Sequence, residues 1–455
     1  LLCEKMVFAS IHLQNGLPGI EHYRRKQMET RRLDELCVQI TDCPHSTPQW
    51  LSSGKLVLRN FNIHNGRIDL SNVSYTDDET FFARNKRATP IPGDIVMSRE
   101  APMGEVAIIP NGFECCLGQR MVLLHPDATV CNGKFLMYSL LSPFVQKQIK
   151  RSDTTGSVVS NLCIPDLCAL EIPYVNIERQ ECIVALLSDI DSKIDNNNAI
   201  SAELEGMAKD LYDYWFVQFD FPDENGNPYK SSGGKMVWNE ELKREIPEGW
   251  EVDRLGKHIT SSRGISYNSA TLEGDGVPMI NLASFGVDSN YKPAGIKTYN
   301  GQYDADKILR PFDLIMCNTQ QTAVDPTKDI IGKAMLVPDI FDGDVVSSHH
   351  ITTIAPDVDE LKYYIYSTCK TTWFHKYIVG FASGTNILGL DFKGFEDYLM
   401  PLPPMRLLQK FATTIKNIES EKSLIITENI ELTSLRDFLL PMLMNGQVKV
   451  KGRDI

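Results

Sequence analysis

The residues that could support catalysis do not occur in the combinations that common enzyme classes require. A nucleotide-binding phosphate loop follows the pattern GxxxxGK[ST], in which backbone amides surround the phosphates. The nearest stretches begin at Gly133, Gly234 and Gly332, and each lacks the hydroxyl residue and the first glycine at the required distance. The sequence also contains no GxSxG elbow, no Gly-rich turn for S-adenosylmethionine and no Asn/Asp-Pro-Pro-aromatic loop for methyl transfer to a base.

Two further groupings only imitate a catalytic site. Pro356, Asp357, Glu360 and Lys362 resemble the acidic set of a Mg-dependent nuclease, but two intervening residues cannot place the two carboxylates on adjacent strands. The pair His349-His350 has no nearby partner that would complete a triad. We therefore assign no catalytic residue, and the sequence favours a binding protein over an enzyme.

Cysteine and histidine usage predicts neither disulfides nor a metal site. The chain has 11 Cys and 9 His in 455 residues, without a CxxC pair or a finger-like spacing. This pattern is typical of a reducing cytosol, so we expect a cytoplasmic protein. No apolar run approaches the roughly 18 residues of a membrane span, so neither a membrane nor secretion is expected.

Net charge is distributed unevenly along the chain. The total is −13, which is unusual for a protein that neutralises phosphates. Residues 31–175, however, hold 14 Lys and Arg against 15 Asp and Glu, whereas residues 176–246 hold 7 against 15. Basic faces on the larger segments are therefore compatible with the composition.

The elements that must position any site occur twice. The run GDIVMSR from Gly93, followed by GEVAIIP from Gly104, has a counterpart in FDLIMCN from Phe312 and GKAMLVP from Gly332. Gly104 and Gly332 are 228 residues apart, and the same offset joins Tyr138-Ser139 to Tyr366-Ser367 and Pro173 to Pro401. An offset held over this distance predicts two tandem copies of one domain.

Each copy changes from short β-rich runs to a long helical pattern. Glu178 to Trp215 and Arg406 to Met444 have apolar residues at intervals of three, four and seven, the seam of a coiled coil. These residues are Leu187, Ile190, Ile194, Leu204, Leu211 and Trp215 in the first helix, and Ile415, Ile418, Ile425, Leu432 and Leu435 in the second. Asn197 and Asn429 lie on or beside the seams, where a buried amide can fix register.

A helix of this kind could instead pack only on its own domain as a core helix. About 57 Å of helix, at ~1.5 Å per residue, is longer than a globular half-domain requires. We therefore expect the two helices to pair with each other, antiparallel if a pseudo-twofold axis relates the copies.

The predicted fold is α+β, with two tandem α/β domains each followed by a long helix. Its segments are an unexplained N-terminal extension (1–27), a first domain (28–175), a first long helix (176–218), a linker rich in Asp, Asn, Gly, Pro and Ser (219–249), a second domain (250–401), a second long helix (402–446) and a tail (447–455).

This order resembles the DNA specificity subunit of type I restriction-modification systems. Supporting stretches are LEIPYVNIERQ from Leu170, LYDYWFVQFDF from Leu211, REIPEGWE from Arg244 and YLMPLPPMRLLQ from Tyr398. The resemblance covers about residues 28–446 and departs from the family pattern in the 27 residues before Met28.

The resemblance implies a reader of double-stranded DNA without catalysis or a cofactor of its own. Each variable domain, or target-recognition domain, would read one half of a split, asymmetric target. The helices would set the spacing and dock two methyltransferase subunits, which bind S-adenosylmethionine and flip the target adenine. A motor and nuclease (restriction) subunit would complete the restriction form.

Candidate DNA-binding residues follow from the side chains that read bases and hold phosphates. In the first domain they are Arg99, Gln119, Arg120, Lys147, Lys150, Arg151, Gly156 and Ser157. In the second domain they are Asn318, Gln320, Gln321, His349, His350, Lys376, Gly384, Thr385 and Asn386.

Two alternatives stay open. A coiled-coil scaffold with two interaction domains and no DNA target would explain the helices, but not two non-identical α/β domains. An enzyme of unfamiliar chemistry would need a cleft of perturbed acids or bases. Copurification of a methyltransferase and salt-dependent DNA binding would separate these alternatives from a specificity subunit.

Overall fold

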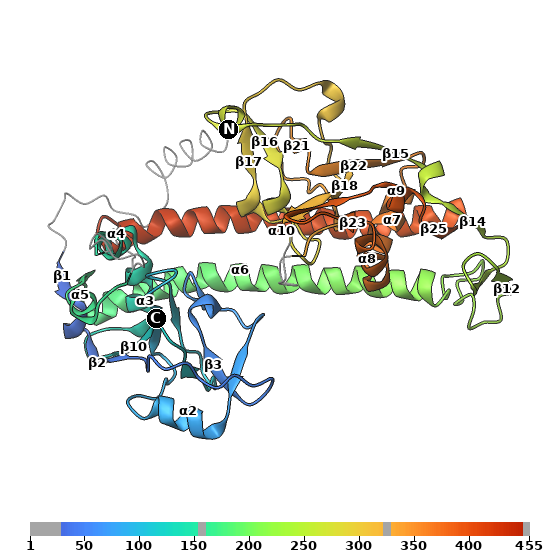
Figure 1. The fold of residues 1–455 in the computed structure, drawn as a ribbon. Helices are drawn as coiled ribbons and strands as arrows, with labels where there is room; N and C mark the ends of the chain where they lie inside the picture. The colour runs from blue at the N-terminus through green and yellow to red at the C-terminus, as the bar shows by residue number, and fades with distance from the viewer. Residues whose placement is uncertain (1–28, 153–160, 322–328, 449–455) are drawn as a thin grey trace. The chain divides into compact units, whose positions relative to one another are not determined.

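The computed structural model describes residues 29–152, 161–321 and 329–448. The chain divides into two compact units. Unit 1 contains the chain up to Lys193 together with the chain from Leu432 onward, and unit 2 contains Ile194–Glu431. Each unit therefore holds one repeated domain and parts of both long helices (Figure 1).

The core of unit 1 is a four-stranded antiparallel sheet in the order β2-β10-β7-β8. Its strands are β2 (Cys37–Asp42), β10 (Met121–Pro126), β7 (Ile95–Ser98) and β8 (Val106–Ile108). All four residues of β7 are buried, and three of them, Ile95, Val96 and Met97, are apolar, as expected of a central strand.

Smaller sheets and short helices complete unit 1. A three-stranded sheet joins β6 (Ser74–Thr76), β3 (Lys55–Leu58) and β9 (Cys116–Leu117). Two-stranded sheets join β1 (Thr30–Arg32) to β11 (Glu171–Pro173) and β4 (Ile63–His64) to β5 (Arg67–Ile68). The short helices are α2 (Asp78–Asn85), α3 (Gly133–Leu141), α4 (Pro143–Arg151) and α5 (Ile164–Cys168).

Unit 2 repeats this architecture. Its four-stranded sheet has β15 (Ile259–Arg263), β22 (Ile351–Pro356), β18 (Leu314–Cys317) and β20 (Ala334–Leu336), and its three-stranded sheet has β17 (Lys297–Tyr299), β16 (Val277–Ile280) and β21 (Val346–Ser347). The outer pair is β14 (Glu251–Arg254) with β25 (Leu399–Leu402), and the helices are α7 (Leu361–Cys369), α8 (Thr372–Val379) and α9 (Lys393–Glu396). An additional sheet joins β19 (Thr319–Gln321), β24 (Ile387–Leu390) and β23 (Ala382–Ser383).

The two domains share strand order, and in both the three-stranded sheet contains one parallel pair, β3 with β9 and β16 with β21. A pair of equivalent glycines shows that the repeat extends to packing. Gly104 and Gly332 have φ values of 91° and 68°, a region that favours glycine. A Cβ atom would lie 3.1 Å from Ile149 Cγ2 on α4 at the first glycine, and 2.6 Å from Ile378 Cγ2 on α8 at the second. The tandem duplication read from the sequence is thus present down to a turn and the helix that covers it.

Two long helices are present at the predicted places. Helix α6 spans Ile177–Tyr212 and continues into a π-helical turn at Asp213–Val217, and helix α10 spans Met405–Met444. The Asn176 side chain accepts a hydrogen bond from Arg179 N at 3.3 Å at the start of α6. Helix α10 is followed by Gly446, whose φ of 67° lets Gln447 N donate to Met442 O at 2.9 Å.

The predicted seam residues differ in burial. Leu187, Ile190, Ile194, Ile415 and Ile418 are buried, Leu204, Leu211, Trp215, Ile425 and Leu432 are half-buried, and Leu435 is 37% exposed. Ile415 and Ile418 belong to the large core cluster of unit 2 together with Tyr364 and Tyr366 of α7. Some of the predicted seam residues of α10 therefore pack on the second domain instead of on α6 alone.

Residues 219–249, expected to be a linker, are folded within unit 2. Phe221 stacks on Tyr229 and Trp250 with ring centroids 4.7 Å and 5.4 Å away. The segment continues into a hairpin of β12 (Met236–Asn239) and β13 (Arg244–Pro247). Its Asp and Asn residues close turns, since Asp223 Oδ1 accepts from Asn225 N and Asn227 N, each at 2.8 Å. Composition alone therefore did not reveal these aromatic anchors.

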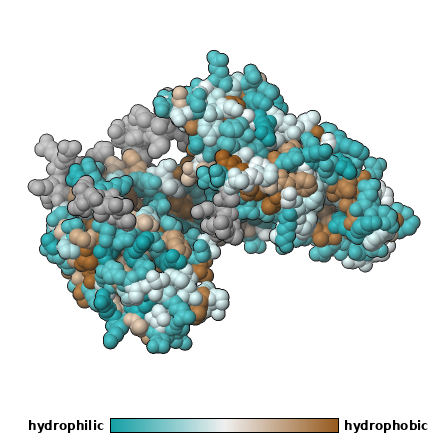
Figure 2. Space-filling model, viewed as in Figure 1, coloured by the Kyte–Doolittle hydropathy of each residue, from teal (hydrophilic) through white to brown (hydrophobic). Residues whose placement is uncertain are grey.

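Figure 2 shows that hydrophilic side chains cover most of the visible face, with apolar side chains gathered in small patches. Within the described ranges, no helix combines the length and apolar character that crossing a membrane would require.

Candidate nucleic-acid interface

Arg99 lies inside the first domain, immediately after β7. Its Nη1 atom is 2.6 Å from Asp42 Oδ1, and its Nε donates to Leu162 O at 2.8 Å. Only 9% of the Arg99 side chain is exposed. The structure thus places this candidate in a buried ion pair that joins three segments, and its contact with DNA stays a prediction.

Gln119 and Arg120 lie at the surface, in the turn between β9 and β10. Arg120 adopts a φ of 65°, and its Nε atom is 3.1 Å from Glu100 Oε2. About half of its side chain, 52%, is exposed. The Gln119 amide donates to Thr47 Oγ1 at 3.1 Å and to the carbonyl of His45. Three segments therefore meet here: the chain after β2, the chain after β7 and the β9–β10 turn.

His349 and His350 occupy the equivalent turn of the second domain, between β21 and β22. His350 Nδ1 is 2.8 Å from Thr319 Oγ1. The His349 ring lies 5.6 Å from the ring of Tyr267 and 3.8 Å from that of His350. The same three kinds of segment meet, because Tyr267 follows β15 and Thr319 follows β18.

These two turns correspond residue by residue. Arg120 and His350 each directly precede a central strand, β10 or β22. Their partners, Glu100 and Thr319, each lie two residues beyond the end of β7 or β18. The two domains therefore build the same surface with different side chains.

The second of these surfaces contains polar atoms without a partner. Within the described residues, Asn318 Oδ1, Ser348 Oγ and His349 Nδ1 are buried and make no hydrogen bond. Burial lowers the pKa of His350, and the nearby His349 and Lys297 lower it further. A neutral imidazole offers one donor and one acceptor.

Other candidates are distributed between core and surface. Asn318 Nδ2 donates to Thr352 Oγ1 at 2.9 Å, and Gln320 Oε1 accepts from Ile330 N and Ile331 N at 2.7 Å each. Both side chains are buried, whereas Gln321 is exposed. The type of residue alone could not separate these two situations.

Basic residues on the second helix of each domain are exposed. Lys147, Lys150 and Arg151 are exposed on α4, and Lys376 is exposed on α8. Gly384, Thr385 and Asn386 form an exposed turn between β23 and β24, in which Gly384 has a φ of 139°. Gly156 and Ser157 lie outside the described residues.

Several side chains near these turns were not predicted from the sequence. Arg59 lies over the rings of Trp50 and Phe61, 4.7 Å and 4.5 Å from the centroids. Lys297 lies 5.2 Å from the ring of Tyr267. Stacked pairs of a basic and an aromatic residue can contact nucleic acid. Aligning the two copies through the β7 and β18 ends would have indicated Glu100 and Thr319.

Among the residues that the structure describes, no three His, Cys, Asp or Glu side chains are arranged to hold a metal ion. In the nuclease-like grouping, Asp357 pairs with His258 at 3.5 Å and Lys362 with Asp359 at 2.7 Å. Asp357 and Lys362 are therefore each engaged in an ion pair with a side chain outside the nuclease-like grouping.

Known proteins resemble this chain in sequence and fold. A family model described as the type I restriction modification DNA specificity domain matches residues 26–206. The MjaIX specificity subunit of Methanocaldococcus jannaschii is 26% identical over 79% of this chain and 78% of its own length. The HindI specificity subunit of Haemophilus influenzae is 22% identical over 78% of this chain and 86% of its own length.

A solved structure shares the fold. The S subunit of a type I restriction-modification system from M. genitalium aligns with a TM-score of 0.53 and 17% identity, covering 93% of this chain and 97% of that chain. The specificity-domain match and the specificity-subunit relatives, which align over more than three quarters of the chain, agree with the duplicated architecture. Residues 26–206 thus match the DNA specificity domain of type I restriction-modification systems, and the chain is similar over more than three quarters of its length to specificity subunits of such systems.

Proposed function

We propose that this chain selects the DNA sequence for a type I restriction-modification complex, with each repeated domain reading one half of a bipartite, asymmetric target. The observation that carries the proposal is the pair of equivalent turns with different side chains, Gln119-Arg120 in one domain and His349-His350 in the other. Two copies of one scaffold with different polar side chains at one place are suited to two different half-sites.

Arg120 is the best-placed residue for a direct base contact. A guanidinium donates two parallel hydrogen bonds to O6 and N7 of guanine in the major groove. An exposed ion pair such as Arg120–Glu100 contributes only about 0–1 kcal/mol, so Arg120 can exchange Glu100 for a base at small cost. In the second domain, His349 and His350 would supply donors and acceptors to the bases. Phosphates would be held by Lys147, Lys150 and Arg151 in the first domain and by Lys376 in the second.

The long helices would act as an antiparallel pair that sets the spacing of the half-sites. Within unit 2, Asn197 Nδ2 donates to Asn429 Oδ1 at 2.9 Å, and Lys422 Nζ donates to Glu205 Oε2 at 2.7 Å. A forward step along α6 from Asn197 to Glu205 is thus matched by a backward step along α10 from Asn429 to Lys422. This direction supports the antiparallel arrangement, and the buried Asn197 amide would fix its register.

Catalysis would come from partner subunits. Two methyltransferase subunits would dock on the helices, bind S-adenosylmethionine and modify adenine, and a motor and nuclease subunit would join them in the restriction form. The complex would work in the cytoplasm, where its DNA is. The purified chain alone should then transfer no methyl group.

Site selection from a randomised duplex library tests the proposal. The full chain, assembled with its methyltransferase subunits, should select two defined half-sites separated by a fixed spacer. The Arg120→Ala variant should relax one half-site and His350→Ala the other, since one direct base contact accounts for about 1–3 kcal/mol of discrimination. The Arg87→Ala variant removes one exposed positive charge and should leave both halves unchanged.

Each other outcome has a distinct meaning. Relaxation of both halves by either single substitution would contradict independent reading by the two domains. A complex that selects no sequence would contradict DNA recognition altogether and favour the coiled-coil scaffold.

A further inference from the structure

A tyrosine at the same position of each domain contacts a carboxylate at the same position of each long helix. Tyr138 and Tyr366 are 228 residues apart, and so are Asp191 on α6 and Glu419 on α10. Tyr138 Oη donates to Asp191 Oδ2 at 2.5 Å, and Tyr366 Oη donates to Glu419 Oε1 at 3.2 Å. The duplication has therefore kept one polar contact between each domain and the helix that follows it.

In unit 1 this contact extends to the other long helix. Arg436 on α10 donates from Nη1 to Asp191 Oδ1 at 3.1 Å. Asp191 thus accepts from α3 and from α10 while it belongs to α6. Its side chain is 21% exposed, as is that of Arg436, so the contact is largely shielded from water.

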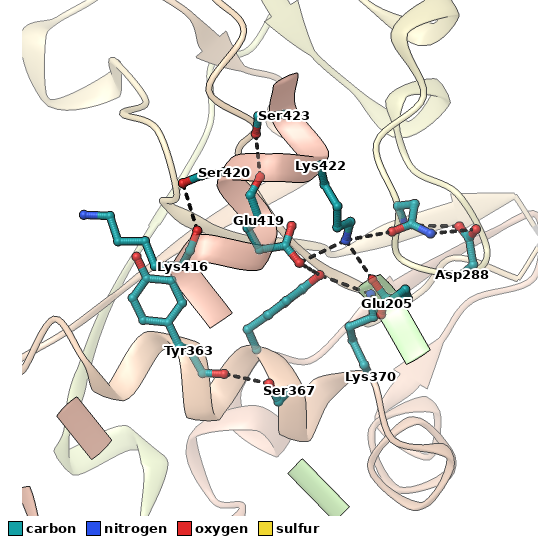
Figure 3. Close-up of polar contacts among 12 residues, drawn as sticks. Glu205, Asp288, Tyr363, Ser367, Lys370, Lys416, Glu419, Ser420, Lys422 and Ser423 are labelled. Atoms are coloured by element: carbon teal, nitrogen blue, oxygen red, sulfur yellow. Dashed lines mark hydrogen bonds and ion pairs between the residues drawn. The ribbon is translucent and has the colours of Figure 1, made fainter. Parts of the chain in front are cut away.

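In unit 2 the contact extends to the other helix through lysines (Figure 3). Lys422 Nζ lies 2.9 Å from Glu419 Oε1 and 2.7 Å from Glu205 Oε2, and Glu205 belongs to α6. Lys370, at the end of α7, also pairs with Glu205. Glu419, Lys422, Lys370 and Glu205 form a network of two positive and two negative groups that joins α7, α10 and α6.

The network is buried, and its charges depend on one another. Only 7% of the Lys422 side chain and 11% of the Glu419 side chain are exposed. Burial opposes the charge of Lys422, but Glu419 and Glu205 outweigh it and raise the pKa of this lysine. Removing one partner would leave a buried charge without compensation, which costs far more than breaking a surface pair.

We propose that Tyr138–Asp191–Arg436 and Tyr366–Glu419–Lys422–Glu205 are two equivalent clamps, each of which fixes one domain on both long helices. They would hold each domain at one place along the pair of long helices, α6 and α10, and so make the complex selective for one spacer length. This inference rests on the proposed function. The residues act as positioning residues and need not touch DNA.

Binding to duplexes that differ only in spacer length tests the clamps. The probes carry the same two half-sites with the preferred spacer or with one to three base pairs more or fewer. The full chain with its methyltransferase subunits is compared with Tyr138→Phe and Tyr366→Phe. Each variant should lower the ratio of the Kd for a wrong spacer to that for the right one by about threefold to tenfold, the effect of one lost hydrogen bond. Base preference within each half-site should not change.

A matched control is available on the same helix. Tyr364 Oη donates to Pro401 O at 3.0 Å, a buried hydrogen bond inside the second domain. The Tyr364→Phe variant loses a similar hydrogen bond without affecting either long helix, so it should leave the spacer ratio unchanged. Glu205→Gln provides a second probe from the α6 side and should lower the ratio as Tyr366→Phe does.

The outcomes separate the inference from the proposed function. An unchanged ratio in Tyr138→Phe and Tyr366→Phe, with half-sites still read, overturns the clamps alone. An equal fall of the ratio in Tyr364→Phe also overturns them, because general loosening would then be the cause. A wild-type complex without any preferred half-sites contradicts the proposed function itself.

Discussion

At the scale of single residues, equivalent positions in the two domains divide between structure and surface. Arg99 and Asn318 both follow a central strand and both point into their domains, where they bond to other segments. Arg120 and His350, at the next equivalent position, lie at the surface turn. The buried pair therefore supports the shape of the turn, whereas the pair at the turn, with Arg120 exposed and His350 half-buried, differs in residue type between the two domains.

Substitution of Arg99 and of Arg120 should separate these roles. Arg99→Ala removes the buried guanidinium that pairs with Asp42 Oδ1, while His45 Nε2 stays 3.0 Å from Asp42 Oδ2, and it should lower the free energy of unfolding by about 3 kcal/mol. Arg120→Ala breaks an exposed pair and should lower it by about 0.5 kcal/mol or less. Urea unfolding of the two variants checks the contrast. Equal losses would mean that the burial of Arg99 does not determine its contribution.

The pKa of His350 predicts a dependence of stability on pH. Because burial and the neighbouring His349 and Lys297 lower the pKa in the folded chain, the folded state binds fewer protons than the unfolded state as pH falls below about 6.5. The wild type should therefore lose more stability between pH 7.5 and pH 5.5 than the His350→Gln variant. Denaturant unfolding at both pH values measures this difference, and identical pH profiles would contradict it.

Residue types in the sequence could nominate the interface but could not separate its exposed members from buried ones. Gln320 is a suitable adenine reader by type, yet its side-chain oxygen holds two backbone amides. By contrast, the equivalent turns were accessible from sequence, because the repeat places Gln119-Arg120 and His349-His350 before matching strands. Partners distant in the chain, such as Glu100 for Arg120, depend on strand pairing, which periodicity does not determine.

At the scale of elements, apolar periodicity predicted the long helices to within a few residues but could not say what each apolar residue contacts. Ile415 and Ile418 fit a helix–helix seam, yet they pack in a cluster that includes Tyr364 and Tyr366. A helix that packs on its own domain in one part and on another helix in the next part has one continuous row of apolar residues along both parts. The same limit applies to residues 219–249, where scattered aromatic residues fold a segment whose composition is typical of a linker.

The asparagine pair identifies where the helices can be lengthened. Inserting one heptad beside Asn197 and a matching one beside Asn429 adds about 10 Å, since a helix rises ~1.5 Å per residue. Three base pairs of B-DNA rise by a similar length but also rotate by about 100°, which the complex must absorb by twisting or bending. We expect a preferred spacer longer by one to three base pairs, weaker binding and unchanged half-sites.

Methylome sequencing of cells that express the lengthened chain measures the spacer. An insertion in α6 alone serves as the control, because it shifts the seam against an unchanged partner and should weaken binding without a new defined spacer. If the doubly lengthened chain kept the old spacer and accepted no longer one, the helices would not set the distance between half-sites.

At the scale of the whole molecule, the acidic total charge limits attraction to DNA, and the boundaries of the two compact units limit which segments can be exchanged. A chain of net charge −13 gains little from non-specific attraction to DNA, so any affinity for phosphates must come from local basic groups such as Lys147, Lys150 and Arg151 on α4. Each unit contains one domain with a portion of both helices, so neither domain ends where its sheet ends. An exchange of domains must therefore respect the contacts that each domain makes with both helices.

Exchange of residues 31–175 for the matching part of a relative should change one half of the target and leave the other half unchanged. The exchanged domain must keep a tyrosine at position 138 and a serine at position 139, because Tyr138 contacts Asp191 and Ser139 Oγ lies 3.3 Å from Met444 Sδ. A donor domain with Phe at position 138 should still change that half-site but should tolerate more than one spacer, since the incoming domain would lack its tyrosine contact to α6. Methylome sequencing reads half-sites and spacer together. A change in both halves, or in neither, would mean that the two domains do not read DNA independently.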